Sequence, residues 1–248
     1  PGFMQAIEAL GPKISNKKIL WATKGFSLSD GSFFSSAIEG LFGGSIKTGV
    51  ISGPTFAEEL AAEKPTAMTI ATKNIAEPGA LATCLSGGSL RVYTSSDMIG
   101  VQFGGGYKNI IAIAAGISDG LGLGANARSA LITRGLDEMN VLGVSLGADK
   151  KTFFGLSGLG DLVLSSTDNK SRNRMLGYHL GSGLTLDDSV VRINGVPEGV
   201  NAIKTLVKNS IVTKKHPISY SVYEVLYEGL APANAAKQLM DRPIKKED

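Results

Sequence analysis

The sequence predicts an α/β fold in its first part and an all-α fold in its second. Over residues 1–96, short apolar segments rich in β-branched residues alternate with helical segments, which is typical of a mainly parallel sheet. After Asp97 the strand signal nearly disappears and apolar residues recur at helical spacing. Of the 248 residues, 43% are hydrophobic and 19% are charged, as in folded globular proteins. We therefore predict one domain over 1–96 and a helical domain over 97–248.

The expected strands follow one another along the first part of the chain. Each contains four or five mostly apolar residues, and together they cover 19–23, 48–51, 67–71 and 90–93. Helices are expected before and between them, over 1–10, 33–41, 56–62 and 77–84. In the second part a long helix is expected after Gly124, because Leu131, Leu136 and Met139 recur at helical spacing. Glycine is frequent, with 32 residues, which indicates close backbone approach to a ligand or between helices.

A glycine loop, G-x-G-x-x-G, between a first strand and a first helix is the usual signature of a dinucleotide-binding sheet. Residues 1–96 do not contain this loop, and their first strand follows a helix. We therefore expect an incomplete Rossmann-like domain whose opening strands and glycine loop lie upstream of Pro1. The residue that distinguishes NAD from NADP would lie in that upstream part, so the sequence does not decide between them.

Composition and charge exclude several classes of protein. The net charge is only +3, and basic residues occur as pairs (17–18, 150–151, 214–215 and 245–246) expected on the surface or in a tail, so no nucleic-acid partner is predicted. No segment approaches the roughly 18 apolar residues of a membrane span. Cys84 is the single cysteine, which excludes an internal disulfide and favours a cytoplasmic location. His179 and His216 lack partners at ligand spacing, so no metal is predicted.

Lys108 is the first candidate for chemistry. It follows Gly104-Gly105-Gly106-Tyr107, which we interpret as a glycine-rich turn, and precedes an apolar run over 110–115. Burial lowers the pKa of a lysine toward neutrality and allows its amine to exchange a proton with a substrate oxygen. A surface lysine that caps a helix is the alternative.

Two later clusters add a carboxylate and an anion-binding group. Asp161 follows Gly158-Leu159-Gly160, interpreted as a turn, at the start of an apolar helix, where an acid can also act as a simple helix cap. Ser171-Arg172-Asn173 is expected in the first turn of another helix, where free N–H groups and a guanidinium favour a phosphate. The alternative for Arg172 is an exposed arginine, and Arg174 is expected to face solvent.

Eight sequence blocks, in the same order, resemble the motif series of bacterial-type NAD(P)-dependent glycerol-3-phosphate dehydrogenase. They are WATKG (21–25), ISGPTFA (51–57), KN (108–109), GLGANAR (122–128), ALITRG (130–135), GLGDL (158–162), SRN (171–173) and PEG (197–199). The resemblance extends over about residues 1–237. Tyr107 and Pro197 depart from the pattern at positions where we expect change to be tolerated.

The resemblance implies reversible oxidation of sn-glycerol 3-phosphate to dihydroxyacetone phosphate, which supplies glycerol 3-phosphate for phospholipid synthesis, with NAD or NADP as cofactor. It implies a catalytic role for Lys108 and Asp161. The implied substrate contacts are Lys24, Gly53, Thr55, Lys108, Asp161, Ser171, Arg172 and Asn173. The implied cofactor contacts are Lys24, Ala57, Arg172, Val196 and Glu198. From spacing alone, Glu198 also fits a helix-capping residue.

Two other interpretations stay open at this point. One is a different two-domain dehydrogenase, of the hydroxyacid or 6-phosphogluconate type. The other is a non-catalytic module that binds a phosphorylated metabolite, because the expected glycine loop is absent from the chain. The oligomeric state is not determined by the sequence, although an exposed helical face is suited to a homodimer contact.

Overall fold

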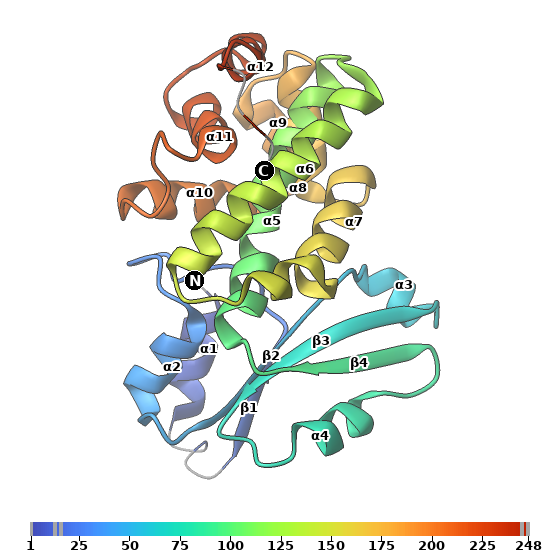
Figure 1. Ribbon diagram of the computed structural model, residues 1–248, viewed down its shortest axis with the longest axis vertical. Coiled ribbons are helices and arrows are strands. Elements are labelled where there is room, and N and C mark those ends of the chain that lie inside the picture. The colour runs from blue at the N-terminus through green and yellow to red at the C-terminus, as the bar shows by residue number, and fades with distance from the viewer. Residues whose placement is uncertain (1, 12–13, 15–16, 244–245, 247–248) are drawn as a thin grey trace.

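The computed structural model describes residues 2–11, 14, 17–243 and 246. A small sheet with its helices forms one part of the molecule, and a bundle of helices forms the other (Figure 1). Pro1 and Lys245, which the sequence assigns to a helix and a basic pair, lie outside the described residues. The predicted change from α/β to all-α structure is confirmed, while the domain limit at 96/97 stays a prediction.

The sheet has four strands in the spatial order β1-β2-β3-β4. Their bounds are Lys18–Trp21, Lys47–Ser52, Thr66–Lys73 and Leu90–Ser95. β1 pairs with β2 and β3 with β4 in parallel, whereas β2 and β3 are antiparallel, with Val50 opposite Ala71. The sheet is therefore mainly parallel, as predicted, with one antiparallel pairing that the sequence pattern did not indicate.

Four helices accompany the sheet, namely α1 (Gly2–Leu10), α2 (Phe34–Phe42), α3 (Ala57–Ala61) and α4 (Pro78–Leu85). Side chains of α1 and α2 pack with those of β1 and β2 in one apolar cluster, of which Trp21, Ile38 and Val50 are members. The first turn of the next helix adds Met98 and Val101 to the same cluster. This shared core joins the sheet to the helical part.

Helix α5 (Met98–Gly120) is the centre of the helical part (Figure 1). Twenty of its 23 residues are buried. The helices that follow are α6 (Gly124–Ser145), the 3₁₀-helix η2 (Lys150–Phe154), the π-helix η3 (Leu156–Gly160), α7 (Asp161–Thr167), α8 (Arg172–Gly181), α9 (Leu186–Arg192), α10 (Glu198–Lys208), α11 (Pro217–Tyr227) and α12 (Pro232–Met240). Helices α6, α7, α8, α10 and α11 all pack against α5. Within the described ranges, no helix is both long and apolar enough to cross a membrane.

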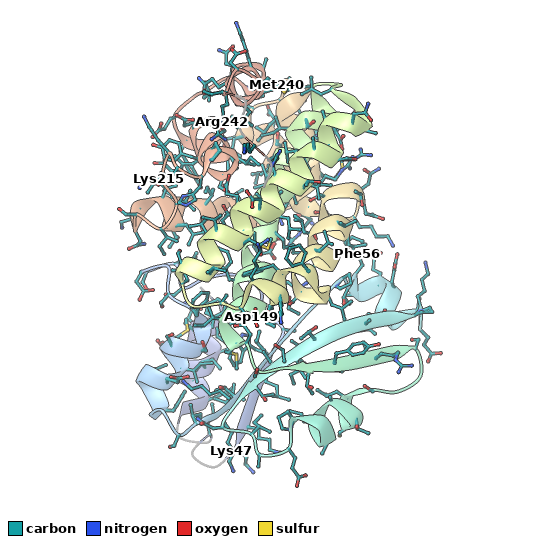
Figure 2. All side chains as sticks on the ribbon, in the orientation of Figure 1. Lys47, Phe56, Asp149, Lys215, Met240 and Arg242 are labelled. Carbon is teal, nitrogen blue, oxygen red and sulfur yellow. The ribbon has the colours of Figure 1, made fainter. Side chains whose placement is uncertain are left out.

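Asp97 fixes the beginning of α5 at the junction of the two parts. Its Oδ1 accepts the N–H of Gly100 at 2.8 Å, the usual contact of an N-cap residue. Its Oδ2 accepts the N–H of Asp149 at 2.9 Å and the hydroxyl of Thr152 at 2.6 Å. Asp149 lies beside this junction in Figure 2. One carboxylate therefore both starts α5 and attaches the segment that leads to η2.

Glycines allow α8 to lie against α5 at backbone distance. A Cβ on Gly116 would come within 1.9 Å of the carbonyl oxygen of Arg174, and a Cβ on Gly177 within 2.0 Å of that of Ile113. A Cβ on Gly181 would likewise meet the carbonyl oxygen of Ile117 at 2.4 Å. Ile113 with Gly177 and Ile117 with Gly181 have the same sequence offset, so the two helices run in the same direction. The prediction that glycines permit close helix approach is confirmed here.

Candidate active site

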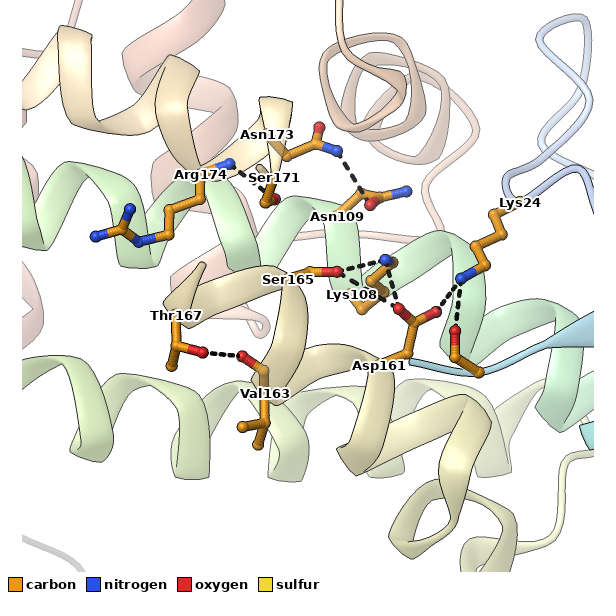
Figure 3. Close-up of polar contacts among 11 residues, drawn as sticks. Lys24, Lys108, Asn109, Asp161, Val163, Ser165, Thr167, Ser171, Asn173 and Arg174 are labelled. Carbon is orange, nitrogen blue, oxygen red and sulfur yellow. Dashed lines mark hydrogen bonds and ion pairs between the residues drawn. The ribbon is translucent and has the colours of Figure 1, made fainter. Parts of the chain in front are cut away.

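Three charged side chains meet where α5, α7 and the end of β1 converge (Figure 3). Lys108 Nζ, on α5, donates to Asp161 Oδ1 at 2.7 Å. Lys24 Nζ, in the loop after β1, donates to the other oxygen of the same carboxylate. Asp161 is the first residue of α7 and its side chain is only 1% exposed. One buried carboxylate is therefore shared by two amines.

Ser165, one turn after Asp161, was not among the predicted site residues. Its hydroxyl accepts a hydrogen bond from Lys108 Nζ and lies within 3.5 Å of Asp161 Oδ1. The spacing of four residues places both side chains on one face of α7. That spacing was visible in the sequence. A serine in a helix does not indicate a site residue, however, until the side chain that it contacts is known.

Gly104, Gly105 and Gly106 lie inside α5, so the predicted glycine-rich turn before Lys108 is wrong. Because they lack side chains, these glycines allow neighbouring groups to lie directly against the surface of the helix. A Cβ on Gly105 would come within 2.6 Å of Ser52 Oγ and 3.5 Å of Lys24 Cγ. A Cβ on Gly104 would meet the carbonyl oxygen of Ser157 at 2.6 Å. Without side chains, this stretch of α5 lets the strand ends and η3 approach Lys108.

The turn predicted before Asp161 is also different in the structure. Gly158 and Gly160 belong to the π-helix η3, which continues directly into α7. A Cβ on Gly158 would come within 2.2 Å of the carbonyl oxygen of Phe153, so the wide helical turn depends on a residue without a side chain. The predicted start of a helix at Asp161 is confirmed.

The environment of Lys108 lowers its pKa from 10.5 to about 8. Burial is the largest cause, because the charged amine loses its water, and the positive charge of Lys24 is the second. The carboxylate of Asp161 opposes both effects, with a smaller contribution from Glu198. The predicted burial of Lys108 is confirmed. At neutral to mildly alkaline pH its amine is able to give and accept a proton.

Gly53 and Thr55 follow β2 beside this cluster. The carbonyl oxygen of Gly53 accepts a hydrogen bond from Lys24 Nζ at 3.0 Å. Gly53 has φ +154°, and a Cβ there would lie 3.0 Å from the carbonyl oxygen of Ala67. The hydroxyl of Thr55 is buried and has no hydrogen-bond partner within the described chain. A buried polar group of this kind calls for a partner that the protein does not supply, such as a water or a ligand.

The first turn of α8 lies beside Lys108. Ser171 is the N-cap residue, and its hydroxyl accepts the N–H of Arg174 at 3.3 Å. Asn173 donates to Asn109 Oδ1 at 3.0 Å, and Asn109 is the neighbour of Lys108 on α5. Asn173 Oδ1 accepts the N–H of Gly199, at the start of α10, also at 3.0 Å. The predicted position of this motif in a first helical turn is confirmed.

Arg172 and Glu198 form an exposed ion pair between the first turns of α8 and α10. Arg172 Nη2 lies 3.0 Å from Glu198 Oε1, and the two side chains are 51% and 50% exposed. Glu198 is the first residue of α10. Exposed pairs of this kind are weak, so Arg172 can exchange Glu198 for another anion. Ala57 and Val196 are exposed as well, outside the hydrogen-bonded cluster.

Arg174 does not face solvent, contrary to the prediction. It is 7% exposed and its guanidinium binds Asp119, at the end of α5. The first turn of α8 thus carries an exposed arginine and a buried one. Sequence alone did not distinguish them, because the difference depends on where α5 packs. Among the described residues there is no cluster of three or more His, Cys, Asp or Glu side chains that could hold a metal ion.

The fold and the site together define the architecture of a two-domain dehydrogenase. A mainly parallel sheet provides Lys24 and Gly53 at its strand ends, and a helical domain adds Lys108, Asp161 and a helix N-terminus. In open α/β sheets, ligands bind outside the carboxyl ends of the strands. The arrangement brings together a buried amine of lowered pKa, a buried carboxylate, and a first helical turn that carries an exposed arginine.

Comparison with known proteins gives the family. The sequence profile described as NAD-dependent glycerol-3-phosphate dehydrogenase C-terminus matches residues 97–237, and the profile of the N-terminus matches residues 2–77. The chain is 48% identical over 234 residues to glycerol-3-phosphate dehydrogenase [NAD(P)+] of Tolumonas auensis, covering 93% of this chain and 70% of that protein. The corresponding protein of Aeromonas salmonicida is 45% identical over 248 residues, with 99% and 74% covered.

A solved structure supports the same assignment. The crystal structure of glycerol-3-phosphate dehydrogenase from Coxiella burnetii superposes with a TM-score of 0.90 at 40% sequence identity, covering 97% of this chain and 74% of that one. The chain belongs to the NAD-dependent glycerol-3-phosphate dehydrogenase family.

Proposed function

We propose that this protein interconverts sn-glycerol 3-phosphate and dihydroxyacetone phosphate with NAD or NADP. Membership of the family supports the reaction. The observation that carries the proposal to particular residues is the buried contact of Lys108 with Asp161, 2.7 Å, beside the N-terminus of α8. That arrangement supports a proton-transfer group beside a phosphate-binding group, as a phosphorylated ketone requires.

Lys108 is the proposed general acid and base. In the reductive direction its ammonium donates a proton to the oxygen of the ketone carbon, and in the oxidative direction the neutral amine removes the hydroxyl proton. A pKa of about 8 makes both forms accessible near neutral pH. Asp161 and Ser165 hold Nζ through two of its three N–H groups, which leaves one for the substrate.

Lys24 and Asp161 are the proposed partners of Lys108 in binding the reacting end of the substrate. Lys24 is 22% exposed, so its amine reaches the site while the carboxylate between the two lysines stays buried. Gly53 orients Lys24 through its carbonyl oxygen. Thr55 offers an unpaired hydroxyl to the substrate.

The phosphate is proposed to bind at the first turn of α8. The positive end of the helix and its free N–H groups favour an anion, and Arg172 provides a guanidinium for bidentate contact. Ser171 and Asn173 act chiefly by fixing the turn, because the serine hydroxyl caps the helix and the asparagine amide bridges α5 and α10.

The residues present fit the nicotinamide end of a dinucleotide. The unpaired hydroxyl of Thr55 and the close backbone approach at Gly53 are features of a site built for a ligand. Lys24, Ala57, Arg172, Val196 and Glu198 are the proposed contacts. When bound, the cofactor supplies or accepts the hydride.

The test is turnover of dihydroxyacetone phosphate with NADH and with NADPH, followed by nicotinamide absorbance, for the wild type and Lys108→Ala. Proton transfer by a positioned group contributes about 10²- to 10⁴-fold, so we expect a loss on that scale with an unchanged circular dichroism spectrum. Lys215→Ala is the control, since Lys215 is an exposed lysine in the helical part (Figure 2). Near-normal turnover of Lys108→Ala would contradict the assignment. Phosphate-ligand binding without turnover by the wild type would favour a binding module.

We also propose a cytoplasmic protein that supplies glycerol 3-phosphate for phospholipid synthesis, without a nucleic-acid partner. The single cysteine, Cys84, is free, as is usual in a reducing compartment, and the low net charge of +3 fits a small-molecule substrate rather than a nucleic acid. A homodimer is proposed from the exposed valines of α6, Val141 and Val144, which are 59% and 47% exposed. Light scattering of the purified protein tests the dimer.

A further inference from the structure

Arg174 is a buried cation in the first turn of the proposed phosphate-binding helix. Its side chain is 9% exposed. Its Nε donates to Asp119 Oδ2 at 3.1 Å, its Nη2 donates to the same oxygen, and its Nη1 donates to Asn169 Oδ1. Three of its five N–H groups therefore bond to Asp119 and Asn169, and the side chain is largely buried. A buried arginine held in this way fixes the position of its own backbone.

Asp119 joins three helices through one carboxylate. It lies in the last turn of α5, and its side chain is 9% exposed. Its Oδ2 receives Arg174 from α8, while its Oδ1 accepts from Arg128 Nη1 of α6 at 2.9 Å. Arg128 is more exposed, at 29%. Removal of the carboxylate would leave Arg174 as the more deeply buried, uncompensated charge.

The pair of Asp119 with Arg174 is a charged contact between α5 and the first turn of α8. Arg174 and Arg172 belong to the same helical turn, so a shift of one carries the other with it. Glycine contacts hold the two helices close, and polar side chains add directional bonds between them. Asn173 with Asn109 provides one polar contact between the two helices, and Arg174 with Asp119 provides the second, charged one.

Lys108 is on the same helix as Asp119, eleven residues earlier, or about 16 Å along the axis. Helix α5 is therefore a common frame for the proton-transfer amine and for the phosphate-binding turn. The distance between the Lys108 amine and the first turn of α8 stays constant only if α8 does not shift along α5.

We propose that Asp119 is a positioning residue for the phosphate group of the substrate, acting through Arg174 on the first turn of α8. This inference rests on the proposed function. Asp119 touches neither substrate nor cofactor. Its carboxylate fixes the position along α5 of the first turn of α8, which carries Arg172. In that position the phosphate of one small molecule contacts Arg172 while its reacting carbon lies at Lys108.

The experiment compares a phosphorylated substrate with its phosphate-free analogue. For the wild type, Asp119→Asn, Asp119→Glu and Arg174→Lys, kcat/KM is measured with dihydroxyacetone phosphate and with dihydroxyacetone. A misplaced binding group typically lowers kcat/KM by about 10- to 100-fold, so Asp119→Asn is expected to lose that much on the phosphorylated substrate. Turnover of dihydroxyacetone should stay within about twofold, since it uses only the lysine end of the site. Asp119→Glu should restore part of the loss.

Binding of inorganic phosphate, measured by calorimetry, gives a readout that does not depend on turnover. Its dissociation constant should rise about tenfold in Asp119→Asn, the scale of one lost charge-assisted contact. Arg128→Gln is the matched control, because it removes the other ion pair of Asp119 and leaves Arg174 bound. It should preserve the ratio between the two substrates.

Equal loss on both substrates in Asp119→Asn would overturn the proposal and leave Asp119 as a general stabilising residue. The proposal would also be overturned if Asp119→Asn left unchanged both the ratio of kcat/KM between the two substrates and the affinity for inorganic phosphate. If Asp119→Asn does not fold, Arg174→Lys decides by the same ratio, because lysine keeps the charge but loses the fork of donors. Absence of turnover in the wild type would instead count against the proposed function, so the two failures are distinct.

Discussion

Replacement of Asp161 by asparagine tests the electrostatics at the centre of the site. The change keeps the shape of the side chain and removes the charge that both Lys108 and Lys24 contact. The Asp161 carboxylate is the largest effect that raises the pKa of Lys108. It opposes burial and the charge of Lys24, which both lower that pKa. An opposite charge at such close range shifts a pKa by about one to three pH units. From about 8, the pKa of Lys108 in Asp161→Asn should therefore fall to neutrality or below.

The consequence differs between the two directions of the reaction. Reduction of the ketone requires the ammonium form of Lys108, and with a pKa near 6 only about one amine in ten would be protonated at pH 7. The alkaline limb of kcat/KM for reduction should move down from about pH 8. Oxidation of the alcohol requires the neutral amine, so its acid limb should move to lower pH by the same amount.

The assay is the pH dependence of kcat/KM in both directions for the wild type and Asp161→Asn. Asp187→Asn is the control, because Asp187 is an exposed acid in the first turn of α9 and so matches the helical position of Asp161 without contacting Lys108. A lower rate with unshifted limbs would refute the electrostatic argument and leave Asp161 as a residue that only holds the two lysines in place.

Two further predictions concern stability. Gly177→Ala should lower the free energy of unfolding by about 1 to 3 kcal/mol, because its Cβ would overlap the carbonyl oxygen of Ile113 at 2.0 Å. Gly79→Ala is the control in the same denaturant titration. It lies in α4 with open space around it, so it should leave the free energy of unfolding unchanged or raise it by up to about 1 kcal/mol. The pKa of Lys108 is lower in the folded protein than the ordinary 10.5, so the cost of burying its charge, about 3 kcal/mol, is fully present below pH 8 and disappears as the pH rises to 10.5. Relative to Lys108→Met, the wild type should therefore gain stability over that interval, and parallel stability curves would contradict the pKa.

The sequence determined those features that depend on local patterns. Alternating apolar segments marked the four strands, and helical periodicity after Asp97 marked the helical part, because strand and helix periods are properties of neighbouring residues. Ser171 was recognisable as the start of a helix since its hydroxyl caps that helix. The ordered motifs also indicated Lys108 and Asp161 as site residues, and the structure brings their side chains together. Their catalytic roles stay predictions.

Tertiary structure decided everything that depends on which surfaces meet. Three consecutive glycines usually favour a turn, yet residues 104–106 are helical, because packing against Ser52, Phe26 and η3 compensates for their low helix propensity. Arg172 and Arg174 are two residues apart in a polar segment, and only the end of α5 makes one of them buried. The same holds for Ser165, whose hydroxyl has a role only because Lys108 lies beside it. The chemistry of this protein was therefore visible as separate residues in the sequence, and it became a site through the close packing of α7 and α8 on one central helix.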